Sequence, residues 1–445
     1  MLKNKPKSSY STLHPFSYMT PFSSTTERDF QSRNICLTRG EGVWVYDGEG
    51  NRFLYATTAV PSVGLGNPFV LDRIRAQYET LNFASTCGQT HPLIEELSRR
   101  LIERSGSSFG QVFYSNDGSG AVETAMRLAR QYWISKGQTK RIKFISLEGC
   151  YHGTTFGSGS VTHLGIQQSF GPGLAECYAA PVPNPYRLPL EGTLQQNIND
   201  CLHLLEELIF EVGPNEVAAV LLEPIQGVNG IVPLPPAYLK SIREITEKYG
   251  ILLIMDEVAT GVGRTGNWIY SHELNIQADL LTLSKGLTGG YFPMGATLIS
   301  ATIAEQLFGN GGIFLHGSTQ SGHPVGCAAA LAVLDYMDEN CLISNAEQRG
   351  SSLLSTLQSA LRDHPYVGDI RGKGLMLAIE FVSDRTTKSP VDFAFGEKLS
   401  AALHQEGVLG NWFNGVLILY PPLTLSPGEE AFLCQAVIKS VHSIE

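Results

Sequence analysis

The chain has 445 residues, of which 43% are hydrophobic and 17% are charged. It is too apolar for a disordered protein, and its length allows two hydrophobic cores or one large core with an appended lobe. The formal net charge is −10 at pH 7, and no run of Lys or Arg is longer than a pair, so the basic surface that nucleic-acid binding requires is missing. The basic start of the chain leads into no apolar targeting segment, and the aliphatic runs are too short to span a membrane. We therefore expect a cytoplasmic protein.

Cysteine and glycine usage add two constraints. The 8 cysteines are spread along the chain, with no CxxC pair and no histidine at metal-ligand spacing. This spacing predicts neither a disulfide framework nor a zinc site, and reduced thiols are expected. Glycine is abundant, at 46 residues. Surplus glycine in such a chain indicates places where the backbone approaches a ligand closely.

The order of predicted elements indicates the fold class. The segment before residue 41 is polar and irregular, with Pro15 and Pro21 interrupting any periodicity, and residues 41–54 predict a hairpin that turns at Asp47–Gly48. From about residue 70, amphipathic helices alternate with short apolar runs, of which the clearest are QVFYS, RIKFISL, VAAVLLE, ILLIMD and DLLTLSK. This alternation predicts an α/β fold with a mostly parallel central sheet covered by helices.

The pattern changes after residue 326. An Ala-rich helix there leads to a segment with its own predicted strands, GKGLMLAIEF and VLILYPP. We therefore predict a large domain over residues 70–325, which the candidate residues below identify as the cofactor-binding one. Residues 1–69 and 326–445 are predicted to form an N-terminal arm and a smaller C-terminal α+β domain. The chain contains no internal repeat and no low-complexity tract.

The first candidate binding residues follow the predicted strand QVFYS. In such sheets ligands bind beyond the carboxyl ends of the strands. Gly118 and Ser119 lie in the turn SNDGSG before an amphipathic helix, where backbone N–H groups and a hydroxyl can hold a phosphate at the start of the helix. Taken alone, a turn of this composition is more often only a turn.

Three further residues follow other predicted strands. Asp256 closes ILLIM, where an isolated acid would usually be a helix cap. Lys285 follows DLLTLS; a lysine enclosed at a strand end can have a depressed pKa and attack an aldehyde, although a lone lysine is usually on the surface. Tyr151 follows RIKFISLEGC and offers an aromatic face, although in isolation it is a typical core residue. Together, a phosphate cradle, a stacking ring, a carboxylate and a nucleophilic lysine are the groups that hold pyridoxal phosphate.

A series of motifs then occurs along the chain: SNDGSGAVETAMRLARQYW, YHG, LLEPIQG, GILLIMDEVATGVGRTG, DLLTLSKGLTGGYFPMGA, HGSTQSGHPVGCAAALAVL, RGKGLML and YPPL. In order and spacing these motifs resemble those of the class III (omega) aminotransferases, which have the type I pyridoxal-phosphate fold. The resemblance extends from about residue 12 to the C-terminus. It implies a pyridoxal-phosphate-dependent transaminase with a large and a small domain.

The resemblance also implies roles for residues that face the cofactor. Lys285 would form the Schiff base with pyridoxal phosphate and later move the proton at the substrate carbon. Asp256 would keep the pyridine nitrogen protonated, so that the ring withdraws electrons. Val258 and Tyr151 would enclose the ring from its two faces.

Other implied roles concern the phosphate, the partner subunit and the substrate. Gly118 and Ser119 match the phosphate-binding turn. Thr319 matches a threonine that reaches the phosphate of the neighbouring subunit, which implies a homodimer. Glu223 belongs to an EP motif near the substrate. Ala259 stands where many members have a glutamine that contacts the phenolic oxygen of the cofactor.

Within the class, HPFSYM, AVETAMRLARQYW, DEVATGVGRTG and SKGLTGG are most similar to 8-amino-7-oxononanoate aminotransferases of biotin synthesis, which use adenosylmethionine or lysine as donor. The residues implied for the substrate pocket differ. Val60 and Pro61 stand where those enzymes carry tryptophan, and Thr154 stands where they place an acid. Asn411 stands where they carry the arginine that pairs with the carboxylate of the acceptor, and no arginine follows Arg385. An amide side chain cannot replace the arginine of an arginine–carboxylate pair without a large loss of binding free energy.

Four hypotheses follow. The first is an aminotransferase that moves an amino group from an amine or amino-acid donor to a neutral or polar ketone or aldehyde acceptor, in a specialised biosynthetic pathway. The second keeps the biotin-pathway reaction, with another cation replacing the arginine. The third is a class III mutase, epimerase or decarboxylase. The fourth is a cofactor-binding protein without activity, against which the presence of Lys285 and Asp256 argues.

Overall fold

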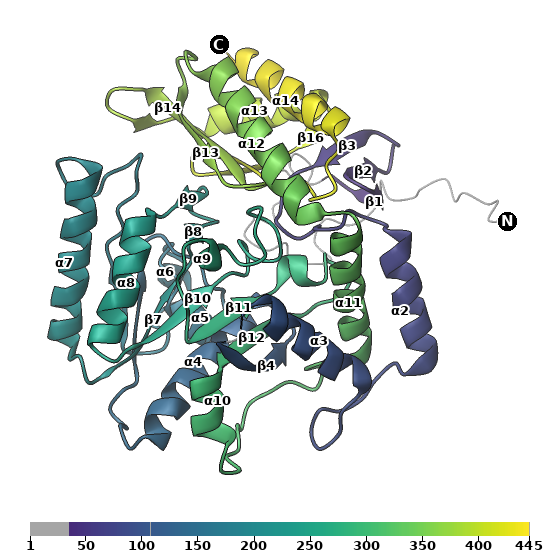
Figure 1. Ribbon diagram of the computed structural model, residues 1–445. Coiled ribbons are helices and arrows are strands. Elements are labelled where there is room, and N and C mark those ends of the chain that lie inside the picture. Colours follow the sequence, from purple (N-terminus) through teal and green to yellow (C-terminus); the bar gives the residue numbers. More distant parts are fainter. Residues whose placement is uncertain (1–34, 107, 445) are drawn as a thin grey trace.

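The computed structural model describes residues 35–106 and 108–444 of the chain. The predicted polar segment with Pro15 and Pro21, and the motif HPFSYM, lie outside the described residues. Figure 1 shows a large lower part built around a central sheet, and a smaller upper part that holds the C-terminus.

The central sheet is mixed and mostly parallel, as predicted. Strand β12 runs antiparallel to both of its neighbours, whereas the strands from β11 to β6 are parallel to one another. In spatial order the strands are β4 (Phe109–Ser115), β12 (Gly295–Ser300), β11 (Leu280–Leu283), β10 (Leu252–Asp256), β7 (Val217–Leu222), β5 (Lys143–Leu147) and β6 (Cys177–Ala180). The side chains of β7, β10 and β11 are buried throughout, which is why these strands read as continuous apolar runs.

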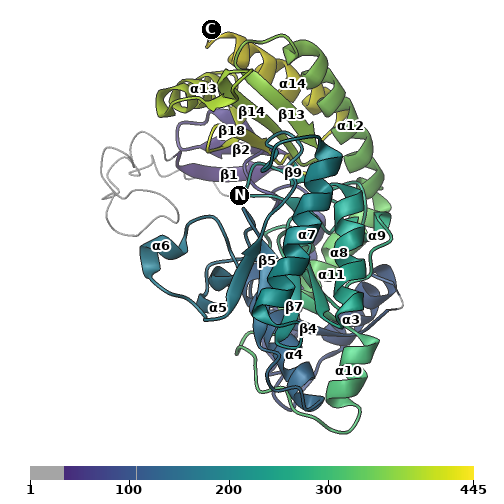
Figure 2. The same cartoon turned by 90° about the vertical axis from the view of Figure 1, so that its left-hand side faces the viewer.

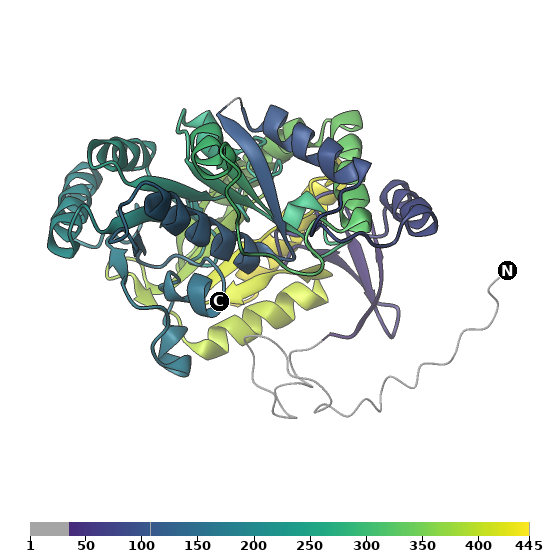
Figure 3. The ribbon, with the colours of Figure 1, turned by 90° about the horizontal axis from the view of Figure 1, so that it is seen from below.

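Helices cover both faces of this sheet, as the view from below shows (Figure 3). Strand β7 illustrates the packing, because its successive side chains point to opposite faces. Ala219 and Leu221 belong to the cluster of helix α4 (Gly118–Ser135) and helix α10 (Ala301–Phe308). Val220 and Leu222 belong to the cluster of α7 (Leu194–Val212) and α8 (Pro236–Lys248). The helix predicted to be amphipathic is α4, and its buried face includes Val122, Ala125, Met126, Ala129, Tyr132 and Trp133.

The N-terminal arm and the C-terminal segment meet in the upper part. The predicted hairpin is formed by β2 and β3, and Asp47 in its turn accepts hydrogen bonds from the backbone N–H groups of Glu49 and Asn51. Strand β16 pairs in parallel with β3. This sheet consists of β1 (Leu37–Glu41), β2 (Trp44–Asp47), β3 (Arg52–Tyr55) and β16 (Val408–Leu409). The domain boundaries at residues 69 and 326 stay a prediction.

A second C-terminal sheet lies beside three helices in the upper part (Figure 2). Its strands are β13 (Val367–Gly372), β14 (Leu377–Asp384), β18 (Val416–Leu419) and β17 (Asn411–Phe413), with β15 (Ser389–Pro390) paired to β14. The helices are α12 (Leu342–Leu361), α13 (Phe393–Gln405) and α14 (Pro427–His442).

The remaining elements flank the central sheet. Helix α11 packs against α2 and α3. These elements are α2 (Pro68–Thr80), α3 (Pro92–Arg104), α5 (Phe156–Ser160), α6 (Gln167–Phe170), α9 (Tyr270–Glu273), α11 (Pro324–Glu339), the 3-10 helix η2 (Lys285–Leu287), and the short pair β8 (Ile225–Gln226) and β9 (Val232–Pro233). No helix in residues 35–106 and 108–444 is long and apolar enough to cross a membrane.

Candidate active site

A cavity of about 400 Å³ lies at the carboxyl ends of β4, β5, β7, β10 and β11. This is the edge of the sheet where the sequence places its candidate residues. The structure brings most of them to the wall of this one cavity: Gly118, Ser119, Tyr151, Glu223, Asp256, Val258 and Lys285.

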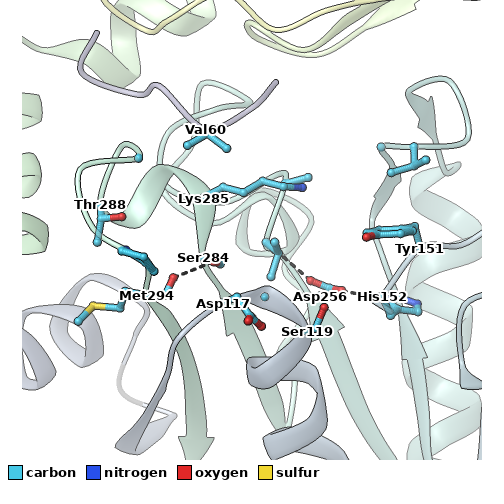
Figure 4. Close-up of a pocket in the computed structure, with 18 of the residues that line it drawn as sticks. Val60, Asp117, Ser119, Tyr151, His152, Asp256, Ser284, Lys285, Thr288 and Met294 are labelled. Carbon is cyan, nitrogen blue, oxygen red and sulfur yellow. Dashed lines mark hydrogen bonds and ion pairs between the residues drawn. The ribbon is translucent and has the colours of Figure 1, made fainter. Parts of the chain in front are cut away.

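Asp256 ends β10 and is held by three hydrogen bonds. Its Oδ2 atom lies 2.8 Å from Nδ1 of His152; Figure 4 draws this interaction as a dashed line. Its Oδ1 atom accepts from the Thr282 hydroxyl at 2.9 Å and from the backbone N–H of Val258 at 3.0 Å. The residue is only 4% exposed. The carboxylate is therefore fixed in orientation at the floor of the cavity.

His152 is a site residue that the residue-level reasoning missed. Burial alone lowers the pKa of His152, but the neighbouring Cys150 thiol and the Asp256 carboxylate outweigh burial and hold this pKa well above its usual value. A protonated His152 compensates the buried charge of Asp256, which an unpaired carboxylate could not sustain. The available signal was its position directly after Tyr151 in the YHG motif.

Glu257, the sequence neighbour of Asp256, has a different environment. It is fully buried, and its carboxylate accepts hydrogen bonds from the backbone N–H groups of Tyr270 and Ser271 and from the Thr260 hydroxyl. Glu257 therefore ties together the loop after β10 and the start of α9, and it does not line the cavity.

Lys285 follows β11 and opens η2 with a φ of 37°, a left-handed conformation that costs energy for a residue with a side chain. Figure 4 shows its side chain extending across the cavity toward Tyr151. Burial lowers the pKa of Lys285 below its usual value, although the carboxylates of Glu223 and Asp256 act in the opposite direction. The enclosed amine is thus more readily neutral than a surface lysine, as a nucleophile must be.

Two glycines allow close packing of the backbone beside the start of α4. A Cβ added to Gly118 would lie 3.0 Å from a methyl group of Val258. Gly153 has a φ of +122°, and a Cβ added there would lie 2.4 Å from the Ser119 hydroxyl. Asp117 caps the helix by accepting from the N–H of Gly120. The first-turn N–H groups of α4 therefore border the cavity, where the helix dipole favours an anion.

Glu223 follows β7 and is 5% exposed. Its two carboxylate oxygens accept from the backbone N–H groups of Tyr151 at 2.9 Å and Gly227 at 3.0 Å. Burial raises the pKa of Glu223 to about 7, and Asp256 adds to this effect, whereas His152 and the two N–H donors reduce it. Glu223 is thus a buried acid that is poorly compensated by its surroundings.

Two predicted site residues are not brought to this cavity. Thr319 is exposed in a turn, although the adjacent Ser318 accepts a hydrogen bond of 2.8 Å from Asn116 on the cavity wall. Asn411 is exposed at the start of β17, where it pairs with Ile418. Other wall residues were not singled out from the sequence: Asn116, Asp117, Val228, Ser284, Thr288, Gly290, Phe292, Pro293, Met294 and Tyr420.

The residues at the cavity fit pyridoxal phosphate. The N–H groups at the start of α4 and the Ser119 hydroxyl, on the cavity wall, suit the phosphate. The fixed carboxylate of Asp256 suits the pyridine nitrogen, and the enclosed amine of Lys285 suits the aldehyde. In the part of the chain that the structure describes, no group of three or more acidic, histidine or cysteine side chains could hold a metal ion.

Comparison with known proteins identifies the family. The family model Aminotransferase class-III matches residues 25–441. The adenosylmethionine-8-amino-7-oxononanoate aminotransferase of Geobacter sulfurreducens is 34% identical, over 97% of this chain and 95% of its own. The putrescine–pyruvate aminotransferase of Pseudomonas aeruginosa is 33% identical, over 93% of this chain and 91% of its own.

Solved structures agree with this assignment. The (S)-enantioselective omega-transaminase from Thermomicrobium roseum superposes with a TM-score of 0.93 at 36% identity, covering 97% of each chain. The PLP-bound amine transaminase from an uncultivated Pseudomonas species superposes with a TM-score of 0.92 at 36% identity, covering 96% of this chain and 99% of its own. These relatives include both amine transaminases and biotin-pathway enzymes, and they do not favour the biotin-pathway reaction. The chain belongs to the class III aminotransferases, and it is a pyridoxal-phosphate-dependent transaminase that moves an amino group from a donor to a ketone or aldehyde.

Proposed function

We propose that Lys285 is the residue that binds pyridoxal phosphate covalently, and that Asp256 holds the pyridine nitrogen protonated. The cofactor, when bound, supplies an electron-withdrawing ring that stabilises negative charge on the substrate carbon. Asp256 would accept a hydrogen bond from the N–H of the ring, and His152 would keep the carboxylate oriented and charged. The amine of Lys285, when it is not bonded to the cofactor, would act as the base that takes a proton from the substrate carbon, and its ammonium form would give that proton back to complete the transfer.

The remaining cofactor contacts are proposed from the same cavity. Gly118, Ser119 and the start of α4 hold the phosphate. Tyr151 and Val258 lie on the cavity wall and enclose the ring, which keeps water away from the reacting carbon. We also propose that the enzyme acts in the cytoplasm, where its free cysteines stay reduced.

A homodimer is the second part of the proposal. Thr319 is exposed and outside the cavity of its own chain, which suits a contact with the cofactor of a second copy. Nearby, exposed apolar side chains surround a separate hollow: Phe156 is 78% exposed, Ile313 71% and Leu315 89%. Helix α5, which begins at Phe156, projects at one side of the large part (Figure 2). Such an apolar surface is typical of one that another subunit covers.

We expect Thr319→Ala to weaken cofactor binding, because the phosphate loses a hydrogen-bond donor from the partner. Leu315→Asp should shift the protein toward monomer and lower its activity. Sedimentation velocity and titration of the apoenzyme with cofactor measure both effects, with Thr80→Ala as a control at an exposed threonine of α2. A fully active monomer would contradict the dimer proposal.

We propose that the substrates are amines and carbonyl compounds that have no carboxylate for an arginine side chain to bind. The composition of the cavity wall supports this proposal. Among the described residues that line the cavity, Lys285 is the one lysine and there is no arginine. Val60, Phe292 and Met294 contribute apolar surface instead. A solved omega transaminase variant engineered for bulky amines carries replacements of a tryptophan, a phenylalanine and an arginine. By the resemblance, Val60, on the cavity wall, stands where the biotin-pathway enzymes carry tryptophan, and Asn411, outside this cavity, stands where they carry arginine.

We expect 8-amino-7-oxononanoate to be a poor acceptor. Without an arginine its carboxylate loses a charge-assisted hydrogen bond of about 1.5–3 kcal/mol, which corresponds to tens- to hundreds-fold weaker use. The chain should therefore not support growth without biotin in a strain that lacks its own 8-amino-7-oxononanoate aminotransferase. The aminotransferase of Geobacter sulfurreducens, expressed in parallel, is the matched control. Robust growth with this chain would favour the biotin-pathway reaction.

A further inference from the structure

The N-terminal arm contacts the loop of residues 285–291 (the lysine loop), which begins with Lys285. Ser62 of the arm is 1% exposed, and its hydroxyl donates a hydrogen bond of 2.8 Å to the carbonyl oxygen of Gly286. Gly286 directly follows Lys285, and it lies 224 residues from Ser62 in the chain. A buried hydrogen bond between such distant segments fixes one segment relative to the other.

A second contact joins the arm to the far end of the lysine loop. The hydroxyl of Tyr291 donates to the carbonyl oxygen of Gly64 at 2.9 Å and accepts from the backbone N–H of Asn67 at 2.6 Å. The backbone between the two contacts is also close to the arm, because a Cβ added to Gly289 would lie 3.2 Å from the Ser62 hydroxyl. The arm therefore holds the lysine loop at both of its ends.

This part of the arm is itself fixed from other directions. The carbonyl oxygen of Ser62 accepts from the backbone N–H of Leu423, in the C-terminal segment, at 3.0 Å. Arg264, which is buried in the loop after β10, donates to the carbonyl oxygens of Leu375 at 3.0 Å and Ala59 at 3.5 Å. Because the arm is tied both to the large part and to the C-terminal segment, it offers a fixed reference for the lysine loop.

The backbone of Lys285 needs such a reference. Its φ of 37° is a left-handed conformation that a residue with a side chain adopts at a cost, and such a conformation persists only where the surroundings hold it. The hydrogen bond from Ser62 acts on the residue directly after Lys285. A relaxed backbone would redirect the Lys285 side chain, which extends across the cavity in Figure 4.

We infer that Ser62 and Tyr291 are positioning residues for Lys285: their hydroxyl groups fix the lysine loop to the N-terminal arm and so aim the amine at the cofactor and at the substrate carbon. This inference rests on the proposed function, because it concerns the lysine of the same site. Neither of these two described residues lines the cavity, so both act through Lys285.

The test measures the two steps that need the amine of Lys285. Full-length apoenzyme is mixed with pyridoxal phosphate; docking is followed by protein fluorescence, and covalent linkage by the absorption of the cofactor. Ser62→Ala should leave docking unchanged and slow the covalent step about 10- to 100-fold, because a misplacement of about 1 Å costs a reacting group up to about 100-fold in rate. In single turnovers of the holoenzyme with pentylamine deuterated at its reacting carbon, proton removal should slow by a similar factor. The amine concentration that gives half the maximal rate should change little.

Two further variants separate positioning from stability. Tyr291→Phe removes the hydroxyl of the second contact and should slow the same two steps, so it decides the matter if Ser62→Ala does not fold. Ser440→Ala is the matched control, because Ser440 is also 1% exposed and its hydroxyl donates to the carbonyl oxygen of Ala436 at 2.7 Å within α14. It should lower the melting temperature about as much as Ser62→Ala and leave both steps at the wild-type rate.

The inference would be overturned if Ser62→Ala, or Tyr291→Phe where Ser62→Ala does not fold, forms the covalent link and removes the proton at the wild-type rates. Equal slowing by Ser440→Ala would overturn it too. Failure of the proposed function gives a different result, because borohydride would then label a lysine other than Lys285 in the wild-type holoenzyme. If the label is on Lys285 and the variants react like the wild type, only the positioning role is wrong.

Discussion

Lys285→Ala is expected to abolish the covalent link to pyridoxal phosphate and to reduce transamination below detection. Lys285 is the one lysine that lines the described cavity, and burial lowers the pKa of its amine, so no neighbouring side chain can replace it. The cofactor should still dock non-covalently, because Gly118 and Ser119 are unchanged.

Borohydride reduction followed by peptide mapping measures this directly. In the wild-type holoenzyme the label should be found on the peptide that contains Lys285, and the Lys285→Ala variant should carry none. Lys240→Ala, at an exposed position of α8, should be labelled like the wild type. A label on any other lysine of the wild-type enzyme would remove Lys285 from its proposed role.

Asp256→Asn should preserve the fold and slow proton removal from the substrate by several orders of magnitude. Asparagine has the same shape, and it can still accept from Thr282 and from the N–H of Val258. It lacks the negative charge that keeps the pyridine nitrogen protonated, so the ring becomes a weak electron acceptor. His152 also loses the charge that raises its pKa.

The measurement is a single-turnover reaction with an amine deuterated at the reacting carbon, in which proton removal is seen as an isotope effect. Glu257→Gln is the contrasting variant, because Glu257 holds the loop before α9 and does not line the cavity. It should lower the melting temperature with a far smaller loss of rate. Near-normal turnover by Asp256→Asn would contradict its role.

The parts of the fold that were predicted are those whose signals are local. Strands β7, β10 and β11 are buried on both faces, so they appear as uninterrupted apolar runs. Helix α4 buries one stripe, so its periodicity is visible. The antiparallel direction of β12 was not predicted, because a buried strand has the same composition in either direction.

The candidate site was only partly predictable for a related reason. Asp256 ends strand β10 and Lys285 follows strand β11, and the topology of a parallel sheet brings such positions together. The hydrogen bond from His152 to Asp256, and the presence of Glu223 and Tyr420 on one cavity wall, depend on how distant segments pack. Tyr420 comes from the small upper part and Glu223 from the central sheet, and no spacing in the sequence relates them.

We propose above all that the enzyme transaminates amines that have no carboxylate for an arginine to bind. The most direct measurement mixes purified holoenzyme with a single amine or amino acid and follows the absorption of the cofactor. Putrescine and pentylamine are expected to convert the cofactor to its pyridoxamine form, whereas alanine and glutamate should do so much more slowly. Rapid conversion by the amino acids with none by the amines would contradict the account, as would a spectrum that returns to its starting form with every amine.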